Sequence, residues 1–171
     1  VYSLVRKENY LKIYEQTFGK IEYSKEVTNG FYMSSSLEYA NRKPLFNTTD
    51  YVTLGRNIAF QSNNPLVPTD FTAPFVQHNI ASLNIGAKIV FDQKYLSYPD
   101  RKFAIGNSKY PAVSINYRKN FGASSSEFNS DLFTANLRQF VSLGNFGNFR
   151  YNVRSGIFLQ QKDIPFMDYL H

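Results

Sequence analysis

The chain has 171 residues, of which 43% are hydrophobic, 17% aromatic and 19% charged, and it contains no cysteine. The lack of cysteine excludes a disulfide scaffold, a thiol nucleophile and any cysteine-ligated metal. The net charge of +6 comes from basic residues that are spread along the chain, so we expect no nucleic acid as a partner. No run of about 18 apolar residues occurs, which excludes a membrane-spanning helix.

Residues 1–18 are expected to form a linker or a short helix that leads into the main domain. Within residues 8–18 the apolar side chains are spaced so that a helix and a strand fit equally well. Residues 1–7 lack the apolar core and the cleavage site of a secretory signal. Residues 166–171 do not form a strand with a terminal aromatic residue. We therefore expect the sequence to be a fragment of a longer polypeptide.

The first hairpin is expected at residues 20–39. Apolar and polar side chains alternate over residues 20–27 and again over residues 31–39, which is typical of strands. Between them, Asn29 and Gly30 form the dipeptide that favours a type I′ turn, in which both central residues have positive φ. Lys43-Pro44 then ends the second strand.

A long loop is expected at residues 45–77, which are rich in Asn, Thr and Pro, with residues 51–60 extended inside it. A structureless stretch of this length is unusual in a compact soluble domain but ordinary for an extracellular barrel loop. Four more alternating segments follow this loop. They are residues 80–91, 112–121, 132–143 and 148–160, with residues 92–110 connecting the first two and the turn 144–147 joining the last two.

This pattern predicts an all-β fold, an antiparallel up-and-down transmembrane β-barrel, of which residues 19–171 form a part. Side chains in a strand point alternately to its two faces, so one face would meet lipid and the other a wet lumen. The expected lumen-facing polar residues are Asn84, Lys88, Asn116, Arg118, Asn136, Arg138, Arg150, Asn152 and Arg154. The expected lipid-facing residues are Leu83, Ile85, Ile89, Val113, Ile115, Leu137, Val141, Val153 and Ile157.

Four of the lumen-facing residues are arginines, and two interpretations of them stay open. In the first, they form a solvated wall whose charges pair with acids from missing strands or from a plug. In the second, they line a path that is selective for anions.

Loop lengths give the barrel an expected orientation, because bacterial barrels keep short turns on the periplasmic side and long loops outside. The turns at residues 28–30 and 144–147 are then periplasmic. Residues 45–77, residues 122–131 and the segment after residue 161 face the exterior. The connection 92–110 is long for a periplasmic turn.

Six short motifs are spread over nearly the whole chain: Tyr39 to Asn47, Ser62 to Pro65, Gln93 to Tyr95, Lys109 to Pro111, Leu143-Gly144 and Phe166 to His171. They resemble an outer-membrane family of unknown function whose members join a carboxypeptidase-regulatory-like domain to a C-terminal barrel. The resemblance implies a barrel similar to the BamA/surface-antigen superfamily, located in the outer membrane of a Gram-negative bacterium. The arginine-bearing loop motif of the better-known members is not evident, so a role in assembly or transport rests on analogy.

The sequence offers little for catalysis. His78 and His171 are the only histidines, and neither has a second ligand at metal spacing, so we expect no metal site and no cofactor. Ser82 follows His78 by four residues, about 13 Å along a strand, which is too far for the hydrogen bond that an outer-membrane phospholipase needs. We therefore expect a protein that is not an enzyme.

Three functions stay open. The first is a non-enzymatic outer-membrane barrel in an assembly or transport apparatus, whose partners are membrane lipid, the remaining strands of the same barrel and other outer-membrane proteins. The second is a passive porin-like channel or a piece of a receptor. The third is a soluble β-sandwich binding module, which needs polar outward faces, whereas the outward positions from Ala81 to Phe91 are all apolar.

Overall fold

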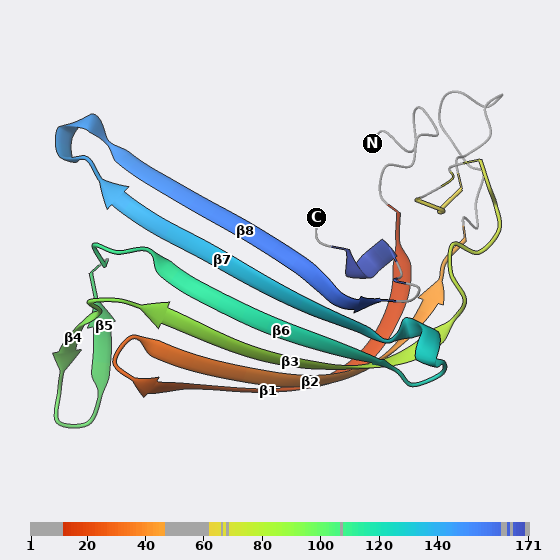
Figure 1. Ribbon diagram of the computed structural model, residues 1–171, viewed down its shortest axis with the longest axis horizontal. Helices are drawn as coiled ribbons and strands as arrows, with labels where there is room; N and C mark the ends of the chain where they lie inside the picture. Colours follow the sequence, from red (N-terminus) through yellow and green to blue (C-terminus); the bar gives the residue numbers. More distant parts are fainter. Residues whose placement is uncertain are drawn as a thin grey trace, which may run out of the picture.

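The computed structural model describes residues 12–46, 62–65, 67, 69–106, 108–161, 164 and 166–169, and its main feature is one antiparallel sheet of six strands. The strands lie in the order β1-β2-β3-β6-β7-β8, so they pair in sequence order apart from a separate small hairpin, β4-β5 (Figure 1). The expected antiparallel pairing is confirmed. The strands are β1 (Tyr14–Thr28), β2 (Phe31–Pro44), β3 (His78–Val90), β4 (Lys94–Ser97), β5 (Lys102–Ile105), β6 (Ala112–Gly122), β7 (Ser130–Ser142) and β8 (Asn148–Gln161).

Three short 3-10 helices accompany the sheet: η1 (Ser126–Phe128), η2 (Gly144–Phe146) and η3 (Phe166–Asp168). η2 lies in the expected tight connection between β7 and β8. No helix in the described part of the chain is long and apolar enough to span a membrane.

The first strand begins earlier than the sequence pattern indicated. Residues 14–18, expected to belong to a linker or short helix, are part of β1 and lie opposite residues 40–44 of β2. The local spacing fitted a helix and a strand equally, and the long ladder to β2 decides between them. Residues 1–11 lie outside the described residues.

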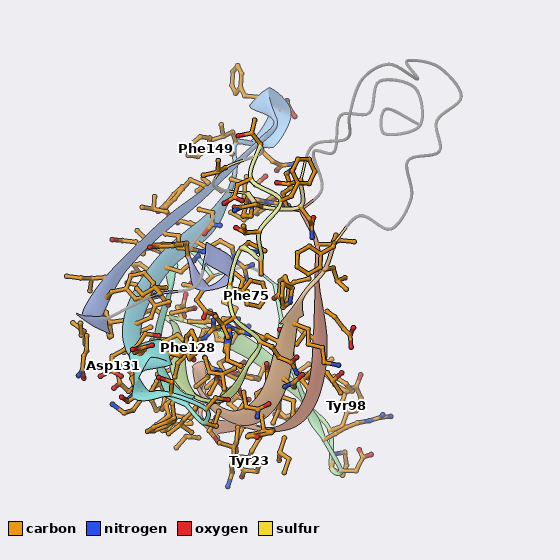
Figure 2. The ribbon with its side chains drawn as sticks, turned by 90° about the vertical axis from the view of Figure 1, so that its right-hand side faces the viewer. Tyr23, Phe75, Tyr98, Phe128, Asp131 and Phe149 are labelled. Atoms are coloured by element: carbon orange, nitrogen blue, oxygen red, sulfur yellow. The ribbon has the colours of Figure 1, made fainter. Side chains whose placement is uncertain are left out.

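The sheet is curved into an open trough (Figure 2). Within the described residues, β1 and β8 each pair on one side only, so this part of the chain is not a closed barrel. Phe75 and Phe128 lie inside the curve, whereas Tyr23 lies outside it. The ring of His78 contacts both phenylalanines, which identifies its side of β3 as the concave face.

The two ends of the trough differ. At one end, here called the turn end, lie the short connections between β1 and β2 and between β7 and β8 (Figure 1). At the other end, here called the loop end, lie the residues that lead into β3 (69–77), the η1 connection and η3. Residues 62–77 contain no strand and no helix among the described positions, and residues 47–61, including the extended piece expected at 51–60, lie outside them.

The β1-β2 turn is not the expected type I′ turn. Gly30 has a φ of +76°, but Asn29 is not among the described non-glycine residues with positive φ, of which Asp92 is the only one. The β1-β2 ladder shifts register between Glu26 and Thr28, so a bulge beside the turn provides the reversal. The Gly30 carbonyl accepts a 2.7 Å hydrogen bond from the Val90 amide, which ties this turn to the end of β3.

The connection at residues 92–110 contains a structure that the sequence did not reveal. β4 and β5 form a two-stranded hairpin that projects from the turn end (Figure 1). The Tyr95 hydroxyl accepts a hydrogen bond from the Gly30 amide at 2.7 Å and donates one to the Glu26 carboxylate. Lys102 Nζ lies 2.5 Å from Asn29 Oδ1, so both strands of the hairpin are fastened to the β1-β2 turn.

We expect Gly30→Ala to lower the free energy of unfolding by about 1 to 3 kcal/mol, because it places a side chain at positive φ. An added Cβ would also overlap the Val90 carbonyl oxygen. Gly19→Ala is the matched control, since a Cβ there meets nothing within 4 Å and φ is not positive. It should change stability by less than about 1 kcal/mol in either direction. Urea titration of both variants measures the difference, and equal losses would contradict this account of the turn.

Candidate functional site

The concave face of the trough brings the polar residues of four strands together. The register pairs Asn84 with Arg118, and it aligns Lys88, Ser114, Asn136 and Arg154 in one row across β3, β6, β7 and β8. All nine residues expected to face a lumen share this face: Asn84, Lys88, Asn116, Arg118, Asn136, Arg138, Arg150, Asn152 and Arg154. The structure thus places them on one surface, which is polar from β3 to β8.

The convex face contains the opposite set. All nine residues expected to face lipid lie there: Leu83, Ile85, Ile89, Val113, Ile115, Leu137, Val141, Val153 and Ile157. Ile85 and Ile115 are each 44% exposed and Val153 is 58% exposed, although all three are large apolar side chains in mid-strand. Nothing among the described residues covers this face.

Most of the buried side chains of the concave face lie at the loop end, where the described residues between 62 and 77, η1 and η3 lie over it. The main contact is an ion pair between Arg42 of β2 and Asp168 of η3, with Nη1 to Oδ2 at 2.9 Å and Nη2 to Oδ1 at 3.1 Å. Their side chains are 8% and 4% exposed. This bidentate pair attaches the segment after β8 to β2, on the far side of the trough.

The Arg42–Asp168 pair was missed by sequence reasoning. Both residues belong to motifs that stood out, Tyr39 to Asn47 and Phe166 to His171, but they are 126 residues apart. The one signal in the sequence was Arg42 itself, a cation on the side of its strand that faces the concave surface. It does not indicate which acid would neutralise it.

A polar row supports the same end of the sheet. Ser82 Oγ donates to Asn120 Oδ1 at 2.7 Å, and Asn120 Nδ2 donates to Ser130 Oγ at 3.0 Å, across β3, β6 and β7. The three side chains are buried and satisfy one another. The sequence placed Ser82 and Asn120 on strands but Ser130 in the connection 122–131, and it did not identify the row; the structure begins β7 at Ser130.

His78 and Ser82 share the concave face but have different partners. His78 Nδ1 lies 2.8 Å from the Val76 carbonyl oxygen, and its ring stacks on Phe128 with a centroid distance of 4.0 Å. Ser82 is hydrogen-bonded to Asn120. The pair therefore has packing and hydrogen-bonding roles at the loop end, and no group of three metal-binding side chains occurs among the described residues.

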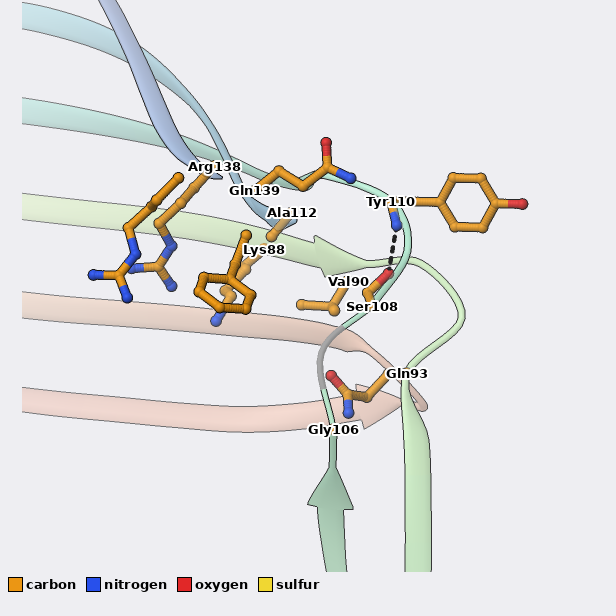
Figure 3. A pocket seen from close by; sticks show the side chains of 11 residues that line it. Lys88, Val90, Gln93, Gly106, Ser108, Tyr110, Ala112, Arg138 and Gln139 are labelled. Atoms are coloured by element: carbon orange, nitrogen blue, oxygen red, sulfur yellow. Dashed lines mark hydrogen bonds between the residues drawn. The ribbon is translucent and has the colours of Figure 1, made fainter. Parts of the chain in front are cut away.

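At the turn end the concave face is open and cationic. Figure 3 shows Lys88 and Arg138 directed into a hollow of about 610 Å³, which Arg150 and Ser108 also line. Arg154 lines the adjoining part of the same trough, beside Lys88 and Arg138. In the described part of the chain no carboxylate forms an ion pair with any of these four cations. Guanidinium groups in such a place can bind carboxylate or phosphate oxygens bidentately.

The rim of this end is made rigid by Tyr95, whose hydroxyl contacts both Glu26 and Gly30. Desolvation and the hydrogen bond to the Glu26 carboxylate raise the pKa of Tyr95 well above its usual range. The phenol therefore stays protonated, and it remains a donor to Glu26, at all physiological pH values.

Residues 1–171 match the model of the C-terminal domain of a family of unknown function (DUF5686). No curated protein and no solved structure shows significant similarity to the chain.

Arg42→Ala should destabilise the fold by about 3 to 5 kcal/mol, because it leaves the Asp168 carboxylate buried without its partner. Lys43→Ala is the matched control on the neighbouring residue, whose ion pair with Glu15 is 3.5 Å long and about half exposed. The free energy of unfolding of Lys43→Ala should fall by at most about 1 kcal/mol. Denaturant unfolding of the two variants checks the prediction, and similar midpoints would show that η3 is not fastened through Arg42.

Proposed function

The chain belongs to the C-terminal domain family of DUF5686 proteins, a family of unknown function, and we propose that it is a part of a non-enzymatic β-barrel in a bacterial outer membrane. One observation supports this proposal above all others. The curved sheet is mainly apolar on its convex face, where the Lys119–Asp131 ion pair is an exception, and polar on its concave face, which is the arrangement of a barrel with lipid outside and water inside. A soluble sheet buries its apolar face instead.

The apolar band extends over five of the six strands, from β2 to β8, whereas β1 places Thr28 opposite Phe31. One lateral row contains Phe31, Ile89, Val113, Leu137 and Val153, and every strand of the row contributes an apolar side chain. An exposed apolar surface of this extent is rare on monomeric soluble proteins, and it marks contact with a membrane or another protein. Contact with lipid also explains why the band follows the convex curvature, where no second sheet could pack against all six strands.

Polar pairs lie on the convex face at the loop end, beyond the apolar band. Glu15 pairs with Lys43 at 3.5 Å, and Asn41 Nδ2 donates to Asn79 Oδ1 at 2.6 Å. Such pairs suit the headgroup region, where water and lipid phosphates are available. The band therefore has a polar border at this end, as the proposed membrane position requires.

The two unpaired edges of the sheet are a second argument that it is part of a larger barrel. In the described residues, the outer sides of β1 and β8 have no strand partner. Unpaired backbone groups are very costly in hydrocarbon, so a membrane sheet must close on itself. We propose that further strands of the same barrel pair with β1 and β8, and that lipid contacts the convex face.

The role of such a barrel is proposed by analogy with similar outer-membrane proteins, as part of an assembly or transport apparatus with other outer-membrane proteins as partners. A passive porin-like channel is the second candidate, because the concave face is polar along its length. Planar-bilayer recording of the full-length protein separates the two: steady ohmic conductance favours the channel, and its absence favours the apparatus.

Detergent dependence is the first expected property. Residues 1–171 expressed alone should be insoluble or require detergent, because the sheet exposes both an apolar face and two unpaired edges. Size-exclusion chromatography with and without detergent measures this. A detergent-free monomer with a cooperative melt would support a soluble β-sandwich module and overturn the membrane proposal.

Substitutions on the two faces should have unequal effects. Ile85→Arg and Ile115→Arg should each disfavour membrane insertion by about 2 to 4 kcal/mol, because they place a charge near the bilayer midplane. Arg118→Ile and Asn152→Ile should be far milder, since they remove polarity from the concave face and expose no charge to lipid. The amount of heat-modifiable, membrane-inserted full-length protein reports the effect.

The concave-face pair is the matched control for the convex-face pair, because Ile115 and Arg118 lie on the same strand, β6, and Ile85 and Asn152 lie on β3 and β8 of the same sheet. Equal losses of inserted protein in the two pairs would show that the assignment of lipid and lumen faces is wrong.

A further inference from the structure

The concave face gathers positive charge at the turn end, and no described acid forms an ion pair with these cations. Arg138 of β7 lies opposite Asn152 of β8, so Arg150 and Arg154, two residues to either side of Asn152, are its diagonal neighbours. Diagonal neighbours across an antiparallel pair are about 7 to 8 Å apart, within reach of long side chains. Lys88 lies at the other end of the row that contains Arg154.

Like charges this close repel one another, so the cluster favours an anion among them. Among the described residues, the acids of the concave face are already engaged elsewhere. Glu26 binds Tyr95, Glu38 accepts a hydrogen bond from Gln16, and Asp168 pairs with Arg42. Glu22 pairs with Lys20 at 2.5 Å. The four cations Lys88, Arg138, Arg150 and Arg154 have no such partner.

The spacing of the arginines indicates the kind of anion. Arg150 and Arg154 are four residues apart on one strand, about 13 Å, and Arg138 lies between them on the neighbouring strand. In an extended peptide, side chains on the same face repeat every two residues, or about 6.6 to 6.8 Å. Carboxylates on three alternate residues would therefore match Arg150, Arg138 and Arg154 in turn.

The floor and the entrance of the hollow suit such a ligand. Ser114 and Asn136 lie between Lys88 and Arg154 and offer hydroxyl and amide donors. The hollow is open at the turn end, where Gln93, Gly106 and Ser108 form its edge (Figure 3). Lys88 and Arg154 lie in one row but on strands that are three spacings, about 14 Å, apart, so the cluster is wide enough for an extended ligand.

We infer that the turn end of the trough is a binding site for an extended acidic peptide segment with carboxylates on alternate residues. This inference rests on the proposed function, in which the concave face is a lumen, and on the orientation expected from the loop lengths, in which the turn end opens to the periplasm. The peptide lies along β7 and β8, and the guanidinium groups of Arg138, Arg150 and Arg154 bind its carboxylates.

The test uses the full-length protein in detergent and in vesicles, with fluorescence anisotropy of a labelled peptide in which Glu alternates with Ser. Arg138→Gln and Arg154→Gln should each weaken binding by about tenfold, as for the loss of one charge-assisted contact. Arg101→Gln is the matched control, because Arg101 is an exposed cation on the β4-β5 hairpin outside the hollow. It should leave the affinity unchanged. A peptide of the same composition with its Glu residues contiguous should bind more weakly.

Several results would overturn the inference. Absence of peptide binding to inserted wild-type protein would do so, and so would equal weakening by Arg101→Gln. Displacement of the peptide by tripolyphosphate at a lower concentration than by unlabelled peptide would assign the site to phosphate ligands instead.

The two proposals fail in distinguishable ways, because membrane insertion of each variant is measured by heat-modifiability on the same samples. Inserted protein that does not bind the peptide overturns the site alone. Protein that is soluble without detergent and binds through Arg138 overturns the barrel alone.

Discussion

The structure depends on one constraint, the two-residue alternation of side chains along the middle of six antiparallel strands in register. A slip of one residue in any ladder would move the apolar side chains of that strand to the polar face. The ladders from β2 through β3 to β6 have no shift, and the two irregularities in the sheet lie near strand ends, at Glu26 to Thr28 and at Asp131 to Leu132. The bulges therefore leave the two faces chemically distinct in the middle of the sheet.

Among the described residues, the buried side chains are mostly polar and gather at the loop end. The buried hydrophobic residues in the described part are Ala40, Ile80 and Leu132, and they lie beside the Arg42–Asp168 pair and the row from Ser82 to Ser130. In a soluble domain, so few buried apolar side chains would not offset the loss of chain entropy. A sheet of this kind needs its apolar face covered from outside, and a bilayer or another apolar partner can do that.

The strands and their faces could be predicted from sequence because both follow from local periodicity. Residues 112–121 were expected as a strand and are part of β6, on which Ile115 and Arg118 lie on opposite faces. Residues 14–18 could not be assigned, because their spacing is ambiguous until β2 lies beside them. The β4-β5 hairpin was missed since each strand has only four residues, too few to show a period. The contacts of Arg42 and Tyr95 join distant parts of the chain, and no local pattern specifies such partners.

The β4-β5 hairpin has a topological consequence for the sheet. An insertion of two strands reverses the chain twice, so β6 returns beside β3 with the direction that a direct turn would give it. The alternation of strand directions in the six-stranded sheet is therefore the same with or without the β4-β5 hairpin. Growth in pairs of strands at this connection could lengthen the turn end over time without disturbing the order or the faces of the six-stranded sheet. A single added strand would reverse β6 and every strand after it.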